Sequence, residues 1–519
     1  MEGLMPITLF ISCLLSFLFA VKVFHSLWWK PKSLEKHLKQ QGIKGTPYKF
    51  LYGDLKELAG CFREAWSKPI NLTHHIVPRV IPFINRTVKI YGKMSFFWIG
   101  TKPTLIILDP ELLKEVLSDK HGRIQKPPRN PHIKLLSNGL SSLQGEKWVK
   151  QRKLISPAFH QEKLKGMTPA FLTSCIELIE KWKKKTYSQG YCELDAWHDI
   201  QDFTADVISR TAFGSNFEEG KKIFELQKEQ SILVMQAVQS VYIPGFRFIP
   251  TKKNKRRMNL DKEIIVNLRD LIRRKTLALE SGKSSVDDLL GMLLQYSRES
   301  SQADMNNLKT TGMSIDQVIE ECKLFYFAGQ ETSSNLLTWT MIVLAMHPSW
   351  QEKAREEVLQ ICGKNMPSYE YLNHLKIVTM ILYEVLRLYP PLVQQIRYTC
   401  KTTKLGDITL PAGVQLILPI LLIHHDREFW GDNAEDFRPE RFSEGISKAS
   451  KDQKVAFFPF GWGPRICIGQ NFAMIEAKMA LAMILQHFSF QLSPSYAHAP
   501  NTIITLQPQH GAQIILHAQ

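Results

Sequence analysis

Apolar residues recur at three- and four-residue spacing through most of the chain, which is the pattern of amphipathic helices. Clear examples run from Phe171 to Trp182, from Ile264 to Ala278 and from Asp287 to Tyr296. Short strand-like runs are fewer, and they occupy 95–98, 104–108, 415–419 and 514–516. Because strands and helices do not alternate regularly, the pattern predicts a mainly α fold with a small β region rather than a doubly wound sheet.

The N-terminal run from Leu4 to Val21 is apolar, carries no charged residue and is long enough to cross a bilayer. Lysines follow the run, whereas only Glu2 precedes it, so the positive-inside rule predicts a lumenal N-terminus and a cytosolic body. A cleaved signal peptide more often carries its charge before the run and a small-residue cleavage site after it. We therefore expect residues 1–29 to be a retained membrane anchor and residues 30–519 to form one large body.

Charge and cysteine usage narrow the class of protein further. The formal net charge of +17 suits nucleic acid, an anionic membrane surface or an acidic protein partner. With an apolar anchor present, the lipid bilayer and a protein partner are the expected ones, and nucleic acid is not. The eight cysteines are spread over the chain without a CxxC pair, which argues against a zinc site or a disulfide scaffold and suits a reducing compartment.

The clearest single helix begins after Ser314, where Ser-Ile-Asp-Gln forms a capping-box start, and continues without proline to His347-Pro348. Such a helix is roughly 45 to 50 Å long at 1.5 Å per residue, so we expect it to cross the core. Gly329 lies near its middle, where glycine costs about 1 kcal/mol relative to alanine. Something is therefore expected to approach the backbone at this glycine.

One segment near the C-terminus reads Phe460-Gly-Trp-Gly463-Pro-Arg465-Ile-Cys467-Ile-Gly469 and precedes the helical run from Asn471 to Phe488. Its glycines would let the backbone come close to a flat ligand. Its cysteine would lie at a helix N-terminus, where amide N–H groups favour a thiolate. A lone cysteine is usually a small buried hydrophobe, but this combination of fixed places is hard to obtain by chance.

This segment resembles the haem-binding signature of the cytochromes P-450 and matches it at every specified place, beginning with Phe460. The resemblance implies that Cys467 is the axial ligand of haem b and that Arg465 contacts a haem propionate. A cysteine thiolate on haem iron pushes electron density towards the iron and favours O–O cleavage. Residues 30–519 would then form a haem-thiolate catalytic domain with the mainly α cytochrome P-450 fold.

The middle of the long helix, Ala328-Gly329-Gln-Glu331-Thr332, resembles the distal oxygen-binding motif of the same family. An acid followed by threonine on a helix is more often a solvated face, but this pair lies on an apolar, core-crossing helix where an ionisable group needs a reason. Oxygen activation needs a hydroxyl and a proton relay within hydrogen-bond reach. Thr332 is expected to supply the hydroxyl and Glu331 the relay, with Gly329 beside the cofactor.

Glu384-Val-Leu-Arg387 places a carboxylate and a guanidinium one helical turn apart, which alone is an ordinary surface ion pair. Together with Arg441 in the later Arg-Pro-Glu-Arg-Phe run, the two look like the buried glutamate–arginine–arginine network of the family. The role that this resemblance implies is structural, because the network fixes the loop that presents the cysteine.

Three further residues are expected at the haem propionates by resemblance. Trp148 and Arg152, in Trp-Val-Lys-Gln-Arg, match an early helix motif of the family, although an amphipathic helix with a buried tryptophan has the same pattern. Arg397 occupies the place of another propionate contact, which is a positional match. The run His424-His425-Asp426 has metal-ligand residue types, but we interpret it as structural.

The segment from Gly42 to Tyr48 is rich in glycine and proline and is expected to be a stiff turn rather than a helix or a strand. In this segment the chain resembles the plant microsomal branch that includes secologanin-synthase-like and triterpene-oxidising enzymes. The implied substrate is a small apolar plant terpenoid: a triterpenoid, an iridoid or a diterpenoid. The implied location is the endoplasmic reticulum membrane, single-pass, with the catalytic domain facing the cytosol.

The resemblance implies a monooxygenase that inserts one oxygen atom from O2, with electrons from NADPH delivered by a separate NADPH–cytochrome P-450 reductase. No G-x-G-x-x-G follows a strand-like run, so the chain is not expected to bind NADPH itself. Two alternatives remain open: a haem-thiolate isomerase or lyase, and a non-catalytic haem-binding sensor or electron carrier. Thr332 argues against the first, and the proton relay together with a membrane anchor argues against the second.

Overall fold

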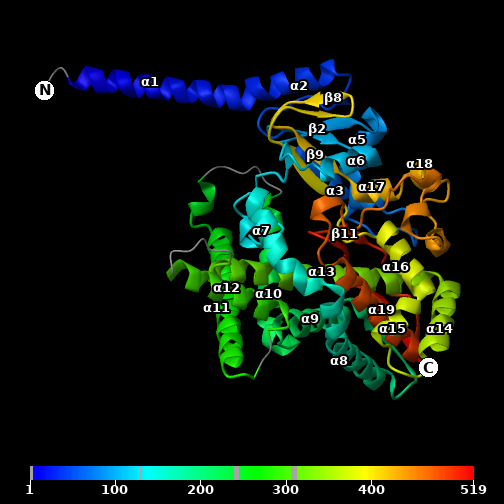
Figure 1. Ribbon diagram of the computed structural model, residues 1–519. Helices are drawn as coiled ribbons and strands as arrows, with labels where there is room; N and C mark the ends of the chain where they lie inside the picture. Colours follow the sequence, from blue (N-terminus) through cyan, green and yellow to red (C-terminus); the bar gives the residue numbers. More distant parts are fainter. Residues whose placement is uncertain (1–3, 129, 239–244, 284–285, 306–311) are drawn as a thin grey trace. The chain divides into compact units, whose positions relative to one another are not determined.

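The computed structural model describes residues 4–128, 130–238, 245–283, 286–305 and 312–519, which group into two compact units (Figure 1). Unit 1 comprises Met1–Ala65, Ile81–Pro127 and Gln394–Pro419, and unit 2 comprises Trp66–Val80, Pro128–Val393 and Ile420–Gln519. This grouping does not test whether the units fold separately, so a single domain over 30–519 stays a prediction.

Unit 1 holds a six-stranded sheet in the order β1-β2-β3-β9-β6-β4 and a two-stranded ribbon, β7-β8. Strands β3 and β9 pair in parallel, with Thr104 opposite Gln415, so segments some three hundred residues apart share one sheet. The strands are β1 Lys44–Gly45, β2 Ser95–Ile99, β3 Lys102–Ile106, β4 Ile124–Gln125, β6 Gln395–Thr399, β7 Thr403–Leu405, β8 Ile408–Leu410 and β9 Gln415–Leu418. The helices are α1 Leu4–Phe24, α2 Lys30–Gln40, α3 Leu55–Ala65, α5 Pro82–Tyr91 and α6 Pro110–Leu117, with a π-helical turn at His25–Trp29.

The expectation of a plain turn from Gly42 to Tyr48 is wrong for two residues. Gly42 does turn the chain, at φ +78°. Lys44 and Gly45 then form strand β1, which pairs in parallel with β2. A side chain on Gly45 would collide with the carbonyl oxygen and the ring of Phe96, so the glycine permits the pairing.

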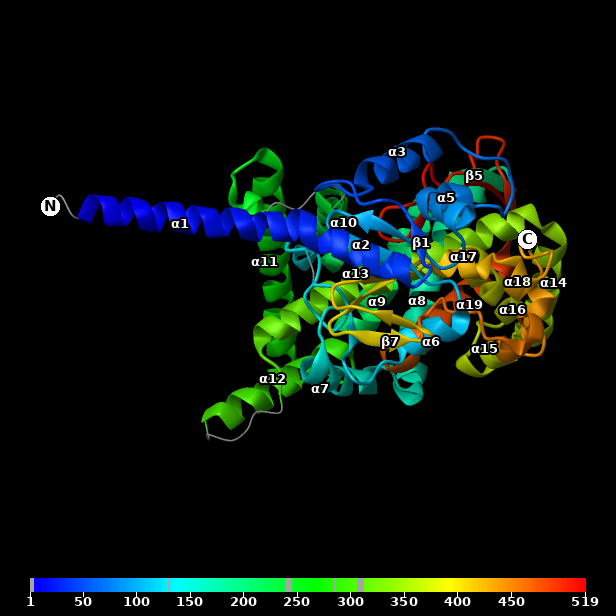
Figure 2. The same cartoon turned by 90° about the horizontal axis from the view of Figure 1, so that it is seen from above.

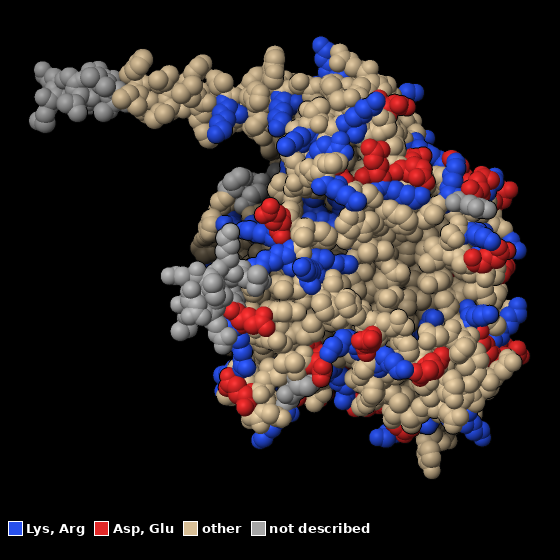
Figure 3. Space-filling model, viewed as in Figure 1, with Lys and Arg blue, Asp and Glu red and all other residues tan. Residues whose placement is uncertain are grey.

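Helix α1 projects from the rest of unit 1, and by length and composition it is able to cross a membrane (Figures 1 and 2). Most of the large apolar side chains described along it, such as Phe10 and Phe19, are exposed. In Figure 3 this part of the helix is tan, and blue basic side chains begin towards its C-terminal end. The helix continues through the π turn into α2, so the helical segment extends beyond the expected anchor boundary at residue 29.

Unit 2 is mostly helical. Its helices are α4 Val77–Val80, α7 Gly145–Ile155, α8 Gln161–Thr186, α9 Ala196–Phe213, α10 Phe217–Val238, α11 Lys252–Glu280, α12 Leu289–Met305, α13 Ile315–Met346, α14 Pro348–Cys362, α15 Tyr369–His374, α16 Lys376–Leu388, α17 Ile420–His424, α18 Arg427–Trp430 and α19 Gln470–His487. Short 3₁₀ turns lie at Ile133–Leu135, Ser156–Phe159, Phe246–Phe248, Pro439–Phe442, Ile446–Lys448, Lys451–Gln453 and Gly463–Arg465. Its strands are β5 Tyr191–Asp195, β10 Phe488–Leu492, β11 Pro500–Thr502, β12 Leu506–Pro508 and β13 Gln513–Ala518, in sheets β10-β13-β5 and β11-β12.

Helix α13 is the central helix of unit 2, as the sequence predicts. Its capping box is formed in both directions, because the Ser314 hydroxyl accepts from the Gln317 N–H and the Gln317 side chain accepts from the Ser314 N–H. From Ser333 to Leu344 every residue is buried. Helices α9, α16 and α19 pack against it, and Figures 1 and 2 show α9 and α19 beside it.

The predicted fold class, mainly α with a small β region, is confirmed.

Candidate active site

The loop that carries Cys467 is closed by its own backbone. The Cys467 N–H donates to the carbonyl oxygen of Phe460 at 2.9 Å. Gly461 and Gly463 adopt φ of +78° and +68°, where L side chains are strained, which explains both glycines. Trp462 between them is extended, at φ −153°, so this place tolerates a side chain although many members of the resembled family have glycine there.

The thiol of Cys467 remains exposed, although Phe458 at the start of the same loop is buried. Protein surrounds the sulfur at longer range, and this desolvation raises the pKa of the Cys467 thiol. The Gly469 N–H and the Arg152 guanidinium lower that pKa, but they do not offset the desolvation. The Gly469 N–H lowers the pKa of the thiol, as expected of an amide N–H group. The net shift of the pKa is nevertheless upward, because desolvation is the larger effect.

Trp148, Arg152 and Arg465 lie together beside this loop. The Arg465 guanidinium carbon sits 4.4 Å from the centroid of the Trp148 indole. Arg465 also donates to the carbonyl oxygen of Leu143 at 2.9 Å, and Arg152 donates to that of Ile466 at 3.0 Å. Helix α7 and the cysteine loop thus hold two guanidinium groups close to Cys467.

These two guanidinium groups are not neutralised by an acid within the described part of the chain. Burial lowers the pKa of Arg465, and the charge of Arg152 lowers it further. A pair of half-buried arginines without a carboxylate partner suits a dianionic group. Together with an accessible cysteine, this donor set fits a haem that presents its propionates to the arginines and its iron to the sulfur.

Aromatic side chains connect α13 to the helix that follows the cysteine. Phe159 stacks on Phe325 of α13, with ring centroids 5.5 Å apart, and meets Phe472 of α19 edge to face at 6.4 Å. Such pairs are worth about 0.5–1.5 kcal/mol each beyond their burial. Through Phe159 they connect α13, at Phe325, to the start of α19.

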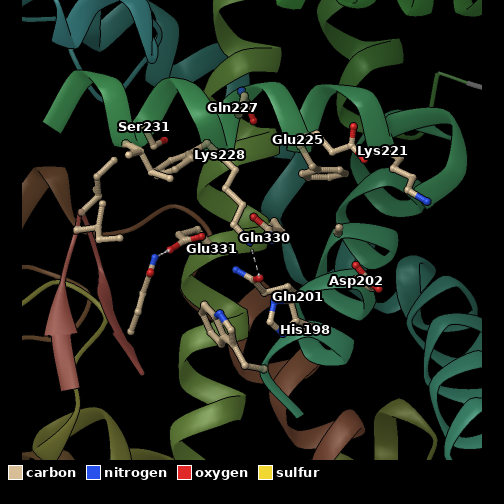
Figure 4. A pocket seen from close by; sticks show the side chains of 18 of the residues that line it. His198, Gln201, Asp202, Lys221, Glu225, Gln227, Lys228, Ser231, Gln330 and Glu331 are labelled. Carbon is tan, nitrogen blue, oxygen red and sulfur yellow. Dashed lines mark hydrogen bonds between the residues drawn. The ribbon is translucent and has the colours of Figure 1, made fainter. Parts of the chain in front are cut away.

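The acid–threonine pair of α13 has two distinct environments. The Thr332 hydroxyl donates back to the carbonyl oxygen of Ala328 at 2.7 Å, one turn earlier. Glu331 is buried, with 7% of its surface exposed. Its carboxylate accepts from the hydroxyl of Thr505 at 2.6 Å and from the side-chain amide of Gln507. Figure 4 shows Glu331 at the side of a pocket. It is therefore not part of a solvated helix face.

Gly329 is approached closely, as expected, and the neighbour within reach is a side chain of unit 2. A Cβ on Gly329 would lie 2.6 Å from Cδ1 and Cγ1 of Ile208 on α9. The glycine is thus required for the crossing of α9 and α13. Its placement beside the cofactor stays a prediction.

Glu384, Arg387 and Arg441 meet in the interior of unit 2. Both Glu384 oxygens accept from Arg387, at 2.7 and 2.8 Å, and both residues are fully buried. Arg441 Nε lies 3.4 Å from Glu384, an ion-pair distance without a good hydrogen bond. Arg387 also donates to the carbonyl oxygens of His424 and Ala434, at 2.7 and 2.6 Å. The alternative of an ordinary surface ion pair is excluded by this burial.

His424 carries this network to the cysteine loop. Its Nδ1 lies 3.1 Å from the Arg387 carbonyl oxygen, and its Nε2 accepts the Phe458 N–H at 2.9 Å. His425 and Asp426 are engaged as well, by the Leu388 carbonyl oxygen and as the N-cap of α18. The structural interpretation of these three residues therefore agrees with their partners.

Arg397 lies in unit 1, on strand β6, and is 7% exposed. It donates to the carbonyl oxygen of Ile396 and to the side chain of Gln395, each at 3.0 Å. Its expected contact with a propionate stays a prediction.

Sequence reasoning missed two groups of polar residues, one on α13 and one on a later segment that binds to α13. Glu321 is fully buried and accepts from the Leu140 N–H at 2.7 Å and from Gln151 at 2.5 Å, which ties α13 to α7 and to the segment before it. Burial raises the pKa of Glu321 to about 8. The second group is Thr505 with Gln507. An acid at a helix position facing the core is the signal that marked Glu331 and could have marked Glu321.

Comparisons with known proteins agree with this geometry. The family model of the cytochromes P-450 matches residues 79–515. Cytochrome P-450 72A397 of Kalopanax septemlobus is 56% identical over 498 residues, covering 96% of this chain and 95% of the relative. The 7-deoxyloganic acid hydroxylase of Catharanthus roseus is 51% identical, covering 96% and 95%. The 11-oxo-beta-amyrin 30-oxidase of Glycyrrhiza uralensis is 53% identical, covering 95% and 94%.

Proposed function

Because this chain belongs to the cytochrome P-450 family of monooxygenases, we propose that it inserts one oxygen atom from O2 into an apolar plant terpenoid. The electrons come from NADPH through a separate reductase. The observation that carries the proposal is the accessible Cys467 beside the unneutralised pair Arg152 and Arg465. Two relatives named for the oxidation of 7-deoxyloganic acid and of 11-oxo-beta-amyrin support a terpenoid substrate, which is an iridoid, a triterpenoid or a diterpenoid.

The residues that hold the haem are proposed as follows. Cys467 would bind the iron through its sulfur, Arg152, Arg465 and Trp148 would hold the propionates, and Arg397 would complete the propionate contacts. Phe460 and Gly329 would lie against the cofactor. When bound, haem with a thiolate ligand supplies the binding and reductive cleavage of O2.

The chain supplies the protons through α13. The Thr332 hydroxyl, which donates to the Ala328 carbonyl oxygen in this structure, would supply a proton to oxygen bound at the cofactor. Once Thr332 has given up a proton, the proton is replaced from Glu331, the adjacent acid. Positioned groups of this kind contribute about 10² to 10⁴ in rate.

The network of Glu384, Arg387 and Arg441 has a structural role in this proposal. It fixes the carbonyl oxygens of His424 and Ala434, and His424 in turn fixes the Phe458 N–H at the start of the cysteine loop. The network thus supports the start of this loop. No reacting atom needs to touch these residues.

Helix α1 is proposed to anchor the protein in the endoplasmic reticulum membrane as a single pass, with the catalytic domain facing the cytosol. The exposed apolar side chains of α1 and the lysines that follow it support this orientation. Resistance of the full-length protein to carbonate extraction, with loss of that resistance when residues 1–24 are deleted, is the expected result. Release of the full-length protein by carbonate would contradict it.

The direct test of the function uses microsomes that contain the chain and a reductase. Fed a plant terpenoid extract and NADPH, they should consume O2 and form products heavier by the mass of one oxygen atom. An isomerase or lyase would convert a hydroperoxide without O2 or reductase, and a sensor would form no product. Either outcome would contradict the monooxygenase.

A further inference from the structure

A pocket in unit 2 opens beside Glu331, and its lining mixes apolar side chains with a smaller number of polar ones. It has a volume of about 220 Å³ and lies between α9, α10, α13 and the segment 503–507 (Figure 4). This is below the roughly 300 Å³ at which pockets for drug-sized ligands begin, and far above the ~30 Å³ share of one water molecule in the liquid. Its lining includes Gln201, Lys228, Ser231 and Gln330, all of which are able to hold water. Several waters fit this space.

Glu331 is held at this pocket by neutral donors. Its Oε1 accepts from Thr505 and from Gln507, and no lysine or arginine of the described residues forms an ion pair with it. Within the same part of the chain, no donor reaches its Oε2. These neutral donors fix the orientation of the carboxylate. The second oxygen remains available to pocket water.

The orientation of the Thr505 hydroxyl is itself fixed. The side-chain amide of Asn335 donates to Thr505 Oγ1 at 3.0 Å and to the backbone carbonyl oxygen of Glu331 at 2.6 Å. Because Oγ1 accepts from Asn335, its own proton points to Glu331. Asn335 and Thr505 are both fully buried, so water does not compete for these bonds.

The face of α13 that carries Glu331 and Asn335 also binds the backbone of the segment from Thr505 to Gln507. The indole N–H of Trp339 donates to the Leu506 carbonyl oxygen at 2.9 Å. Glu331, Asn335 and Trp339 are four residues apart and therefore lie on one face of the helix. Three successive residues, Thr505 to Gln507, are bound to that face.

We propose that Thr505, Asn335 and Gln507 are positioning residues that hold Glu331 at the inner end of a water-filled proton inlet. The inlet is the pocket between α9, α10 and α13. Glu331 takes one proton from pocket water at Oε2 and releases one proton to the Thr332 side of α13, so the carboxylate is regenerated in each cycle. The inference depends on the proposed monooxygenase function.

The experiment compares full-length, haem-loaded protein with Thr505→Val, which removes the hydroxyl and keeps the shape. Thr340→Val is the matched control, because the Thr340 hydroxyl is also buried and donates only within α13, to Leu336 at 2.7 Å. The first readout is the infrared carboxylate band of Glu331, assigned by its loss in Glu331→Gln. We expect this band to shift in Thr505→Val and to stay in place in Thr340→Val.

The second readout is the solvent isotope effect of D2O on product formation, which should increase in Thr505→Val. The rate of product formation should fall by about tenfold, the factor that a hydrogen bond to a charged group represents. Thr505→Ser should restore both values. Gln507→Leu, at a half-buried position, gives a second variant if Thr505→Val does not fold. An unshifted carboxylate band, or an isotope effect equal to that of Thr340→Val, overturns the inference. A wild-type protein that forms no oxygenated product overturns the proposed function instead.

Discussion

The Nε2 atom of His424 accepts the backbone N–H of Phe458 at 2.9 Å, and both residues are buried. An acceptor at Nε2 requires the neutral imidazole with its proton on Nδ1, which faces the Arg387 carbonyl oxygen. The histidine therefore joins the arginine network to the cysteine loop only while it stays unprotonated.

Replacing His424 by alanine should lower the free energy of unfolding by about 1–3 kcal/mol, because the Phe458 N–H is left buried without an acceptor. Haem content per protein should fall with it. Chemical unfolding and the absorbance of bound haem measure the two effects. Normal haem content in a destabilised variant would show that His424 supports the fold and not the loop.

His424 also predicts a pH dependence of stability. Burial and the Arg387 charge lower the pKa of His424 from 6.5 to about 3. Because the folded pKa is the lower one, its contribution is complete above about 6.5 and is lost as the pH falls towards about 3. His424→Gln keeps a donor and an acceptor without titrating, so its free energy of unfolding should fall less steeply over this range. Equal slopes in the two proteins would contradict the assignment.

Removing one partner of the buried pair Glu384 and Arg387 should be costly. Glu384→Gln leaves the fully buried Arg387 without its carboxylate, for which the expected loss is about 3–5 kcal/mol. Glu440→Gln is the control, since Glu440 pairs with Arg438 at 3.2 Å on the surface and should contribute below about 1 kcal/mol. Urea unfolding measures both. Similar losses in the two variants would argue against the structural role of the network.

Gly329 provides a test of helix packing. Gly329→Ala places a methyl group 2.6 Å from Ile208, so it should destabilise by about 1–3 kcal/mol despite the better helix propensity of alanine. Gly166→Ala on α8 meets nothing within 4 Å and should stabilise by up to about 1 kcal/mol. Combining Ile208→Ala with Gly329→Ala should cost less than the sum of the two single changes, which thermal unfolding of wild type, both single variants and the double variant measures. Additive effects would exclude the proposed collision.

Features within one helix or strand were predictable from the sequence, whereas contacts between elements far apart in the sequence were not. The capping box at Ser314 and a close approach at Gly329 follow from residues a few positions apart, because helix geometry fixes their relation. The neighbour of Gly329 is Ile208, from a different helix, which no local pattern identifies. Glu331 and Thr505 are 174 residues apart, and strand β1 depends on a partner strand some fifty residues later. Long-range pairing of this kind is set by packing and not by propensity.

The oxygen-activation role of α13 predicts a selective chemical defect. Thr332→Ala removes a hydroxyl whose bond lies within the helix, so folding and haem content should change little. With substrate and reductase present, NADPH consumption should continue while product per NADPH falls and hydrogen peroxide rises. Glu331→Gln should instead slow turnover with less peroxide, because it removes the proton supply. Thr340→Ala on the same helix is the control. An unchanged ratio of product to NADPH in Thr332→Ala would contradict the role of Thr332 in oxygen activation.

The central claim is that Cys467 is the sulfur ligand of a haem. The most direct measurement is the absorbance spectrum of the reduced, carbon-monoxide-bound full-length protein, in which a thiolate ligand gives a red-shifted Soret band. Wild type and the exposed-cysteine control Cys400→Ser should both show this band, and Cys467→Ala should lack it while remaining folded by circular dichroism. Survival of the band in Cys467→Ala, or its loss in folded Cys400→Ser, would contradict the account.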